Sequence, residues 1–127
     1  MKNKISFLFA LTLLLLVGIT GCSKNDYGTN SYNSNPDTPG PNEVFIQNIT
    51  FNPKTITVSA GTTIKWTNKD NVAHTVSSGT PGSPNGTFES GNMNVGATFS
   101  YMFSTKGTFP YYCKLHQDTM TGTVVVQ

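Results

Sequence analysis

The segment from Cys113 to Met120 carries three side chains that bind soft or borderline metal ions. Cys113 offers a thiolate, His116 an imidazole and Met120 a thioether, all within one short stretch. Together with a second imidazole, this ligand set suits a copper ion that cycles between Cu(I) and Cu(II). The chain has only two histidines, so the second imidazole has to come from His74. The sequence therefore predicts one copper site built from His74, Cys113, His116 and Met120.

Each of these residue types also has an ordinary structural role. A single methionine or cysteine is most often a buried apolar side chain, and a histidine on a strand is most often a hydrogen-bonded polar group. Zinc is chemically possible at a site of one cysteine and two histidines, but zinc makes little use of a thioether. A multicopper oxidase would need many more histidines, and a binuclear copper centre would need a second cysteine in the loop. The sequence therefore predicts a protein that is not an enzyme.

The N-terminus has the form of a lipoprotein signal peptide. A short basic start precedes the apolar run Ile5–Ile19, which is the order of regions in a secretory signal. This run is short for a transmembrane helix. The residues Thr20-Gly21-Cys22 that follow resemble a bacterial lipobox. We expect removal of residues 1–21 and lipidation of Cys22, which would anchor the exported protein to a membrane, facing the periplasm or the cell exterior. The alternative is cleavage nearby that leaves Cys22 as a free thiol.

The rest of the chain divides into a linker and one small domain. Residues 23–42 are rich in Asn, Ser, Gly, Pro and Thr, so we expect residues 22–42 to be the lipidated cysteine and a flexible linker. Residues 43–127 are long enough for one hydrophobic core. Without the signal peptide the chain has six lysines and six acidic residues. This near-neutral charge, with no basic patch, argues against nucleic-acid binding.

Apolar and polar residues alternate along the folded part with the period of β-strands. Clear runs occur at Thr55–Val58, Thr63–Thr67 and Ala97–Phe103, and Gly, Asn and Asp residues typical of turns separate them. Seven or eight short strands without a helical period predict an all-β protein, an antiparallel β-sandwich. We expect His74 on a short strand over residues 72–77, followed by a long loop over residues 78–86.

Two residues near the proposed ligands, a proline and a glycine, give expectations about the local backbone. Pro110 cannot donate a hydrogen bond to a neighbouring strand, so its strand is expected at a sheet edge or with a bulge. Gly122 is expected to let the backbone bend back into the sheet after the segment that ends at Met120.

Five segments of the folded part form a specific pattern, namely Phe51–Gly61, Ile64–Asn68, Ala73–Val76, Phe88–Gly91 and Gly107–Val126. With these residues the chain from about Phe51 to Val126 resembles the small blue copper proteins, the cupredoxins of the plastocyanin and amicyanin type. The resemblance implies a Greek-key sandwich with one type 1 copper ion. His74, Cys113 and His116 would lie in a near-trigonal plane around it, and Met120 would be a long axial ligand.

The chain departs from the family pattern in two places. The residue after the first ligand histidine is often Asn in this family and is Thr75 here. The backbone N–H of Thr75 is still expected to donate to the Cys113 sulfur, as the groups around metal ligands often do. The number of residues between His116 and Met120 lies between those of the amicyanin and plastocyanin loops, which affects the expected reduction potential rather than the existence of the site.

The favoured function is one-electron transfer between redox proteins, such as a cytochrome, an oxidase or a reductase. A rigid sandwich limits the change of geometry between Cu(I) and Cu(II), and a partly exposed His116 ring would lead the electron to a docked partner. Val72, Ala73 and Leu115 are expected near that ring as a small apolar docking patch. We expect the protein to be a monomer.

Two other functions are compatible with the same sequence. Copper delivery, buffering or tolerance would employ the same ligands, and tails rich in Met or His would favour it. The chain has only four methionines, of which Met93 and Met102 are expected to pack against other residues. The remaining alternative is a metal-free, immunoglobulin-like spacer on a lipid anchor.

Overall fold

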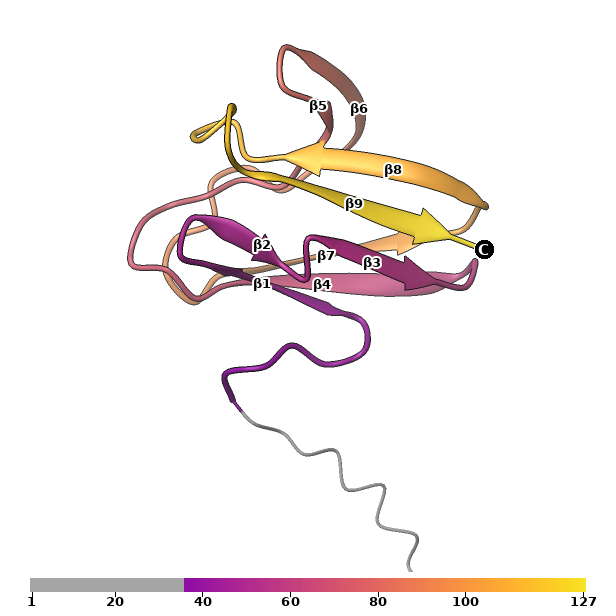
Figure 1. Ribbon diagram of the computed structural model, residues 1–127, viewed down its shortest axis with the longest axis horizontal. Coiled ribbons are helices and arrows are strands. Elements are labelled where there is room, and N and C mark those ends of the chain that lie inside the picture. The colour runs from indigo at the N-terminus through magenta and orange to yellow at the C-terminus, as the bar shows by residue number, and fades with distance from the viewer. Residues whose placement is uncertain (1–35) are drawn as a thin grey trace, which may run out of the picture. The chain divides into compact units, whose positions relative to one another are not determined.

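The computed structural model describes residues 36–127, which form nine β-strands in two sheets that pack face to face (Figure 1). The proposed signal peptide, Cys22 and the first part of the linker lie outside the described residues. One sheet has the strand order β2-β1-β4-β7 and the other has the order β3-β9-β8-β5-β6. The strands are β1 (Glu43–Gln47), β2 (Thr50–Asn52), β3 (Thr55–Val58), β4 (Thr62–Asn68), β5 (Ser77–Thr80), β6 (Ser83–Glu89), β7 (Thr98–Phe103), β8 (Gly107–Tyr112) and β9 (Thr121–Val126).

The all-β sandwich predicted from the sequence is confirmed, with two differences in detail. Residues 36–127 contain nine strands rather than seven or eight. The sheets are also not wholly antiparallel, because β1 pairs in parallel with β4, and β3 pairs in parallel with β9. Within residues 36–127, no helix is long and apolar enough to cross a membrane.

The hydrophobic core lies between the two sheets and follows the alternation of the sequence. In β4, Ile64 and Trp66 are fully buried, while Lys65 between them faces outward. In β9, Val124 and Val126 are buried in the same way. The Trp66 ring packs edge-on against Tyr111 of the opposite sheet, with 5.5 Å between ring centroids. Burying each large apolar side chain contributes about 1.5–3 kcal/mol, so this core holds the strand ends in place.

The region around His74 differs from the sequence-based expectation. His74 is not part of a strand but forms an isolated antiparallel bridge with Met93. The next strand, β5, begins only at Ser77 and makes a hairpin with β6 in place of the expected long loop. This hairpin projects beyond the two layers (Figure 1). Its Ser-, Gly- and Asn-rich strands show almost no apolar alternation, so the sequence carried no signal for them.

Three further expectations have clear outcomes. β8 lies between β9 and β5 in its sheet, but β5 pairs only with Tyr111 and Tyr112 of β8. At Pro110 the β5 side of the strand is therefore an open edge, so the missing N–H of Pro110 faces no partner strand. Gly122 is not among the glycines with a positive φ, and what it provides is space for a neighbouring side chain. A Cβ atom there would lie 2.4 Å from Cζ of the Tyr111 ring. Met102 is 57% exposed on β7 and does not pack in the core, whereas Met93 is buried.

Candidate metal centre

The candidate ligands lie at one end of the sandwich, which we call the ligand end. Four segments meet there, namely the β1–β2 turn and the loops over residues 69–76, 90–97 and 113–120. The parallel pairing of β1 with β4 brings the β1–β2 turn beside the loop that carries His74. The β8–β9 pairing closes the loop of residues 113–120, which we call the ligand loop, at the same end.

Three potential metal ligands from two distant segments converge in this region. The donor atoms of His74, Cys113 and His116 all lie within 4.8 Å of one another. The Cys113 Sγ atom is 3.8 Å from Nδ1 of His74 and 3.6 Å from Nδ1 of His116. Nitrogen and sulfur atoms bound to one ion at about 2.0 and 2.3 Å, roughly 120° apart, would lie about 3.7 Å from each other. The two sulfur–nitrogen separations therefore fit donors that bind a single metal ion.

Backbone hydrogen bonds hold the loop that supplies most of these groups. The N–H of Cys113 donates to the carbonyl of Met120 at 3.0 Å, which joins the two ends of the loop. The N–H groups of His116 and Met120 donate to carbonyls within the loop, at 3.2 and 3.1 Å. Cys113 and Met120 are fully buried, whereas His116 is only half-buried. The loop thus buries Cys113 and Met120 and leaves His116 partly exposed.

The Cys113 sulfur accepts a hydrogen bond from the backbone of Thr75. The Thr75 N–H lies 3.4 Å from Sγ, at the place expected from the sequence. The Thr75 hydroxyl oxygen accepts a hydrogen bond from the Lys114 N–H at 2.8 Å and lies 3.2 Å from the Ser77 hydroxyl. Ser77 in turn donates to the Glu89 carboxylate, which pairs with the Lys114 ammonium at 2.6 Å. A closed chain of polar contacts therefore ties the residue after Cys113 to the residue after His74.

The outer nitrogen of His74 is held by a carboxylate. Nε2 of His74 lies 2.9 Å from Oδ2 of Asp70. Burial lowers the pKa of His74 and outweighs the opposing effect of Asp70, so the imidazole is neutral and free to bind a metal at neutral pH. Burial alone would raise the pKa of Asp70, but hydrogen bonds from the N–H groups of Ile49 and Asn48 and from His74 hold this pKa below its usual value.

Asp70 and Asn68 are residues whose role the sequence analysis missed, because both lie in a stretch typical of a turn. The Asn68 side chain is fully buried and donates to the carbonyls of Val72 and Met93 at 2.8 and 2.9 Å. Its Oδ1 atom accepts a hydrogen bond from the Asp70 N–H. Asn68 thus joins two of the loops at the ligand end. The one available signal was an acidic residue four positions before His74.

Comparison with known proteins agrees with this geometry. The family model described as copper binding proteins of the plastocyanin/azurin family matches residues 41–127. The chain belongs to this family. Since its donor set also fits, a single type 1 copper ion is the cofactor of this cupredoxin.

Individual relatives cover most of the same region. Plastocyanin from Scenedesmus fuscus is 31% identical in an alignment of 86 residues that covers 62% of this chain and 88% of the relative. Amicyanin-alpha from Methylorubrum extorquens is 30% identical over 88 residues, covering 69% and 73% of the two chains. Among solved structures, a purple cupredoxin from Nitrosopumilus maritimus matches with a TM-score of 0.61 and 29% identity, over 67% of this cupredoxin and 98% of that protein.

The residues expected at a docking patch lie on the two loops of the ligand end that carry His74 and His116. Val72 and Leu115 are exposed, and Ala73 is partly exposed. Two further apolar side chains at the ligand end are exposed, Ile49 and Val95, and the sequence analysis did not single them out. Among the described residues, four of the five exposed large hydrophobic side chains therefore lie on the loops of the ligand end.

Proposed function

We propose that this cupredoxin carries single electrons between redox proteins through a copper ion held by His74, Cys113, His116 and Met120. The observation that carries the proposal is the convergence of three donor atoms within 4.8 Å, two of them on buried residues and the third on a half-buried histidine. Bound copper supplies a one-electron Cu(I)/Cu(II) couple. The fully buried Met120 is assigned as the weak fourth ligand because its carbonyl accepts the Cys113 N–H, which holds the two residues next to each other at the ends of the loop.

The protein residues favour electron transfer because their positions depend on hydrogen bonds rather than on the metal. The loop closure at Cys113, the Thr75 N–H on the sulfur and the Asp70 carboxylate on His74 each hold one ligand. Ligands held in this way change little between two oxidation states, which keeps the reorganisation on electron transfer small.

The test of the ligand set is the visible and electron paramagnetic resonance spectrum of the copper-loaded protein. We expect an intense thiolate-to-copper charge-transfer band in the Cu(II) form, and we expect Cys113→Ser to abolish it. The exact hue is not part of the test, since the relative from Nitrosopumilus maritimus is described as purple. A colourless protein that takes up zinc in preference to copper would refute the proposal.

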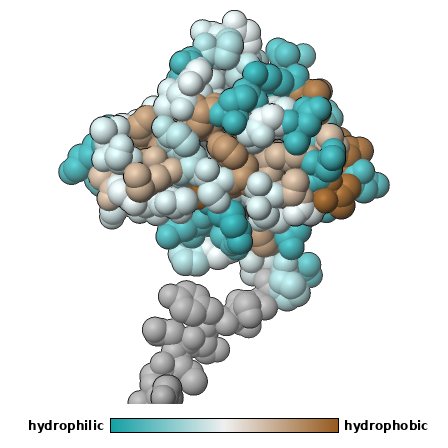
Figure 2. All heavy atoms as spheres, turned by 180° about the vertical axis from the view of Figure 1, so that it is seen from behind, coloured by the Kyte–Doolittle hydropathy of each residue, from teal (hydrophilic) through white to brown (hydrophobic). Residues whose placement is uncertain are grey.

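We propose that redox partners dock on the apolar surface around His116. Apolar residues gather at the right-hand end in Figure 2, which is the ligand end, and charged or polar residues surround them. Leu115 is 51% exposed beside His116, so Leu115→Asp should slow electron exchange with a partner protein while leaving the spectrum unchanged. Met102→Asp is a matched control, because Met102 is similarly exposed but lies on β7, where it pairs with Thr63 far from the ligand loop. Equal rates for the two variants would contradict this docking site.

Copper delivery or buffering remains the alternative and predicts a different experiment. An electron carrier exchanges electrons quickly and releases its ion slowly, whereas a delivery protein passes the ion itself to an acceptor. We expect rapid self-exchange of electrons and slow loss of copper to a competing chelator. Rapid transfer of Cu(I) to the chelator, with slow self-exchange, would favour delivery.

We also propose that residues 1–21 are a signal peptide, that Cys22 is lipidated, and that residues 22–42 tether the domain of residues 43–127 to a membrane outside the cytoplasm. The supporting observation is the lipobox-like sequence before Cys22. The full chain expressed in a bacterium should fractionate with membranes, and Cys22→Ala should release it. Equal fractionation of the two proteins would contradict the lipid anchor.

A further inference from the structure

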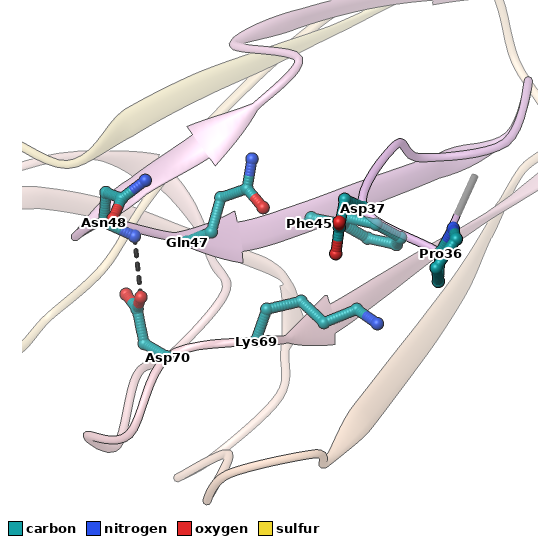
Figure 3. A pocket seen from close by; sticks show the side chains of 7 residues that line it. All are labelled: Pro36, Asp37, Phe45, Gln47, Asn48, Lys69 and Asp70. Carbon is teal, nitrogen blue, oxygen red and sulfur yellow. Dashed lines mark hydrogen bonds between the residues drawn. The ribbon is translucent and has the colours of Figure 1, made fainter.

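The Asp70 carboxylate joins a proposed copper ligand to a turn on the other side of it. Its Oδ2 atom lies 2.9 Å from Nε2 of His74 and also accepts the Ile49 N–H at 2.9 Å. Its Oδ1 atom accepts the Asn48 N–H at 2.6 Å. Figure 3 shows the carboxylate beneath the backbone of Asn48, with the dashed line marking this contact. One side chain therefore receives two backbone donors and one imidazole.

The turn that Asp70 holds has an unusual backbone. Asn48 and Ile49 have φ angles of 55° and 56°, in the left-handed region. Asn tolerates this region, but a β-branched residue such as Ile rarely adopts it. Such conformations cost on the order of 1–3 kcal/mol each and persist where the surroundings enforce them. The two N–H groups that converge on Asp70 supply part of that enforcement and keep the carboxylate oriented toward His74.

The orientation of Asp70 selects one form of the neutral imidazole. A carboxylate accepts hydrogen bonds but donates none, so the contact requires the His74 proton on Nε2. Nδ1 then carries the lone pair, and this is the atom that lies 3.8 Å from the Cys113 sulfur. A carboxylate hydrogen-bonded to the outer nitrogen of an imidazole also makes the inner nitrogen a better electron-pair donor to the metal. A better electron-pair donor favours the more highly charged metal ion.

We propose that Asp70 is a positioning residue that, anchored by the β1–β2 turn, fixes the metal-binding tautomer of His74 and lowers the reduction potential of the site. The proposal rests on the assignment of His74 as a ligand. It concerns the protein without metal as well, because the Asp70–His74 contact joins two residues of the chain itself.

The first measurement is nuclear magnetic resonance of the metal-free protein at neutral pH. We expect a slowly exchanging Nε2–H signal of His74 in the native protein and rapid exchange of that proton in Asp70→Asn. The amide protons of Asn48 and Ile49 should also lose protection in the variant. An Nε2–H that exchanges equally fast in the native protein and the variant would overturn the proposal whatever the copper-loaded protein does.

The second measurement is the reduction potential of the copper-loaded proteins. Loss of a group behind a metal-binding histidine typically weakens metal binding about 10- to 100-fold. If that loss falls on Cu(II), each tenfold change raises the potential by about 59 mV. Asp118→Asn is the matched control, because Asp118 is an exposed carboxylate in the ligand loop and the substitution removes the same charge. A shift in Asp70→Asn no larger than in Asp118→Asn would overturn the proposal.

A folding defect would not make these measurements impossible. Ile49→Gly should relieve the backbone strain of the turn, so Asp70→Asn can be compared with native Asp70 in that background. The native charge-transfer spectrum tests the ligand set separately. A native protein without that spectrum would refute the proposed function, and a normal spectrum with an unmoved potential in Asp70→Asn would refute only the role of Asp70.

Discussion

The hydroxyl of Thr75 is expected to stabilise the ligand loop, and Thr75→Val tests this expectation. Thr75 is almost fully buried, and its Oγ1 atom accepts the Lys114 N–H at 2.8 Å and contacts the Ser77 hydroxyl at 3.2 Å. Valine has nearly the same shape as threonine but carries a methyl group in place of the hydroxyl. The substitution therefore removes the acceptor while keeping the Thr75 backbone N–H that donates to the Cys113 sulfur.

The size of the effect follows from the groups left without a partner. A lost neutral hydrogen bond costs about 1 kcal/mol, and leaving a buried partner unsatisfied costs about 1–3 kcal/mol. We expect the unfolding free energy of the metal-free protein to fall by about 2 kcal/mol. For a domain of this size, each kcal/mol lowers the melting temperature by about 4–8 °C. The charge-transfer band should persist, because the sulfur keeps its hydrogen bond.

Urea denaturation and amide hydrogen exchange are the assays, with Thr75→Ser as the control. Serine keeps the hydroxyl and loses one methyl group, which costs about 0.8 kcal/mol of apolar burial. The Lys114 amide should be protected in the native protein and in Thr75→Ser, and should exchange rapidly in Thr75→Val. If Thr75→Val is as stable as the native protein and the Lys114 amide stays protected, the Thr75 hydroxyl does not stabilise the ligand loop.

Three other predictions concern the surroundings of the site. Met120→Leu should keep the charge-transfer band but raise the potential measured by voltammetry, since losing a weak donor disfavours Cu(II), and a tenfold effect equals about 59 mV; an unchanged potential would exclude axial ligation. Gly122→Ala should destabilise the protein in urea by about 1–3 kcal/mol, because the new Cβ would collide with the Tyr111 ring, and Tyr111→Leu in the same background should recover part of the loss. Burial raises the pKa of Tyr111 and outweighs the opposing effect of Trp66, so folding favours the neutral phenol. Stability should therefore decline above about pH 10, where an unfolded tyrosine ionises, and Tyr111→Phe should weaken that decline.

The sequence predicts those strands well whose pattern of apolar and polar residues agrees with their burial in the folded protein. The strands β3, β4 and β7 alternate buried and outward-facing residues, as their sequences do. The same alternation places Met102 on the outside, between the inward-facing Tyr101 and Phe103. Treating Met102 as a packing residue ignored the period of its own strand.

The β5–β6 hairpin could not be predicted in this way. Its residues are mostly polar. One of its buried contacts is a hydrogen bond from a backbone group to a side chain, which the Phe88 N–H donates to the Ser78 hydroxyl. Gly79 is required because a Cβ atom would lie 2.5 Å from the Ser83 carbonyl oxygen. Such requirements arise from close approach between chain segments and leave no periodic trace in the sequence.

The amino-acid sequence alone shows which side chains can bind a metal and that three of the four proposed ligands lie within one short segment. This information is local, since a thiolate, an imidazole and a thioether close together in the chain remain close in any fold. The folded structure is needed to show that His74 reaches Cys113, 39 residues away in the chain, and that Asp70 and Thr75 hydrogen-bond to these two proposed ligands. The physical reason is that parallel strand pairing and the bridge between His74 and Met93 join distant segments, and the free energy of those contacts comes from the whole sandwich rather than from any one segment.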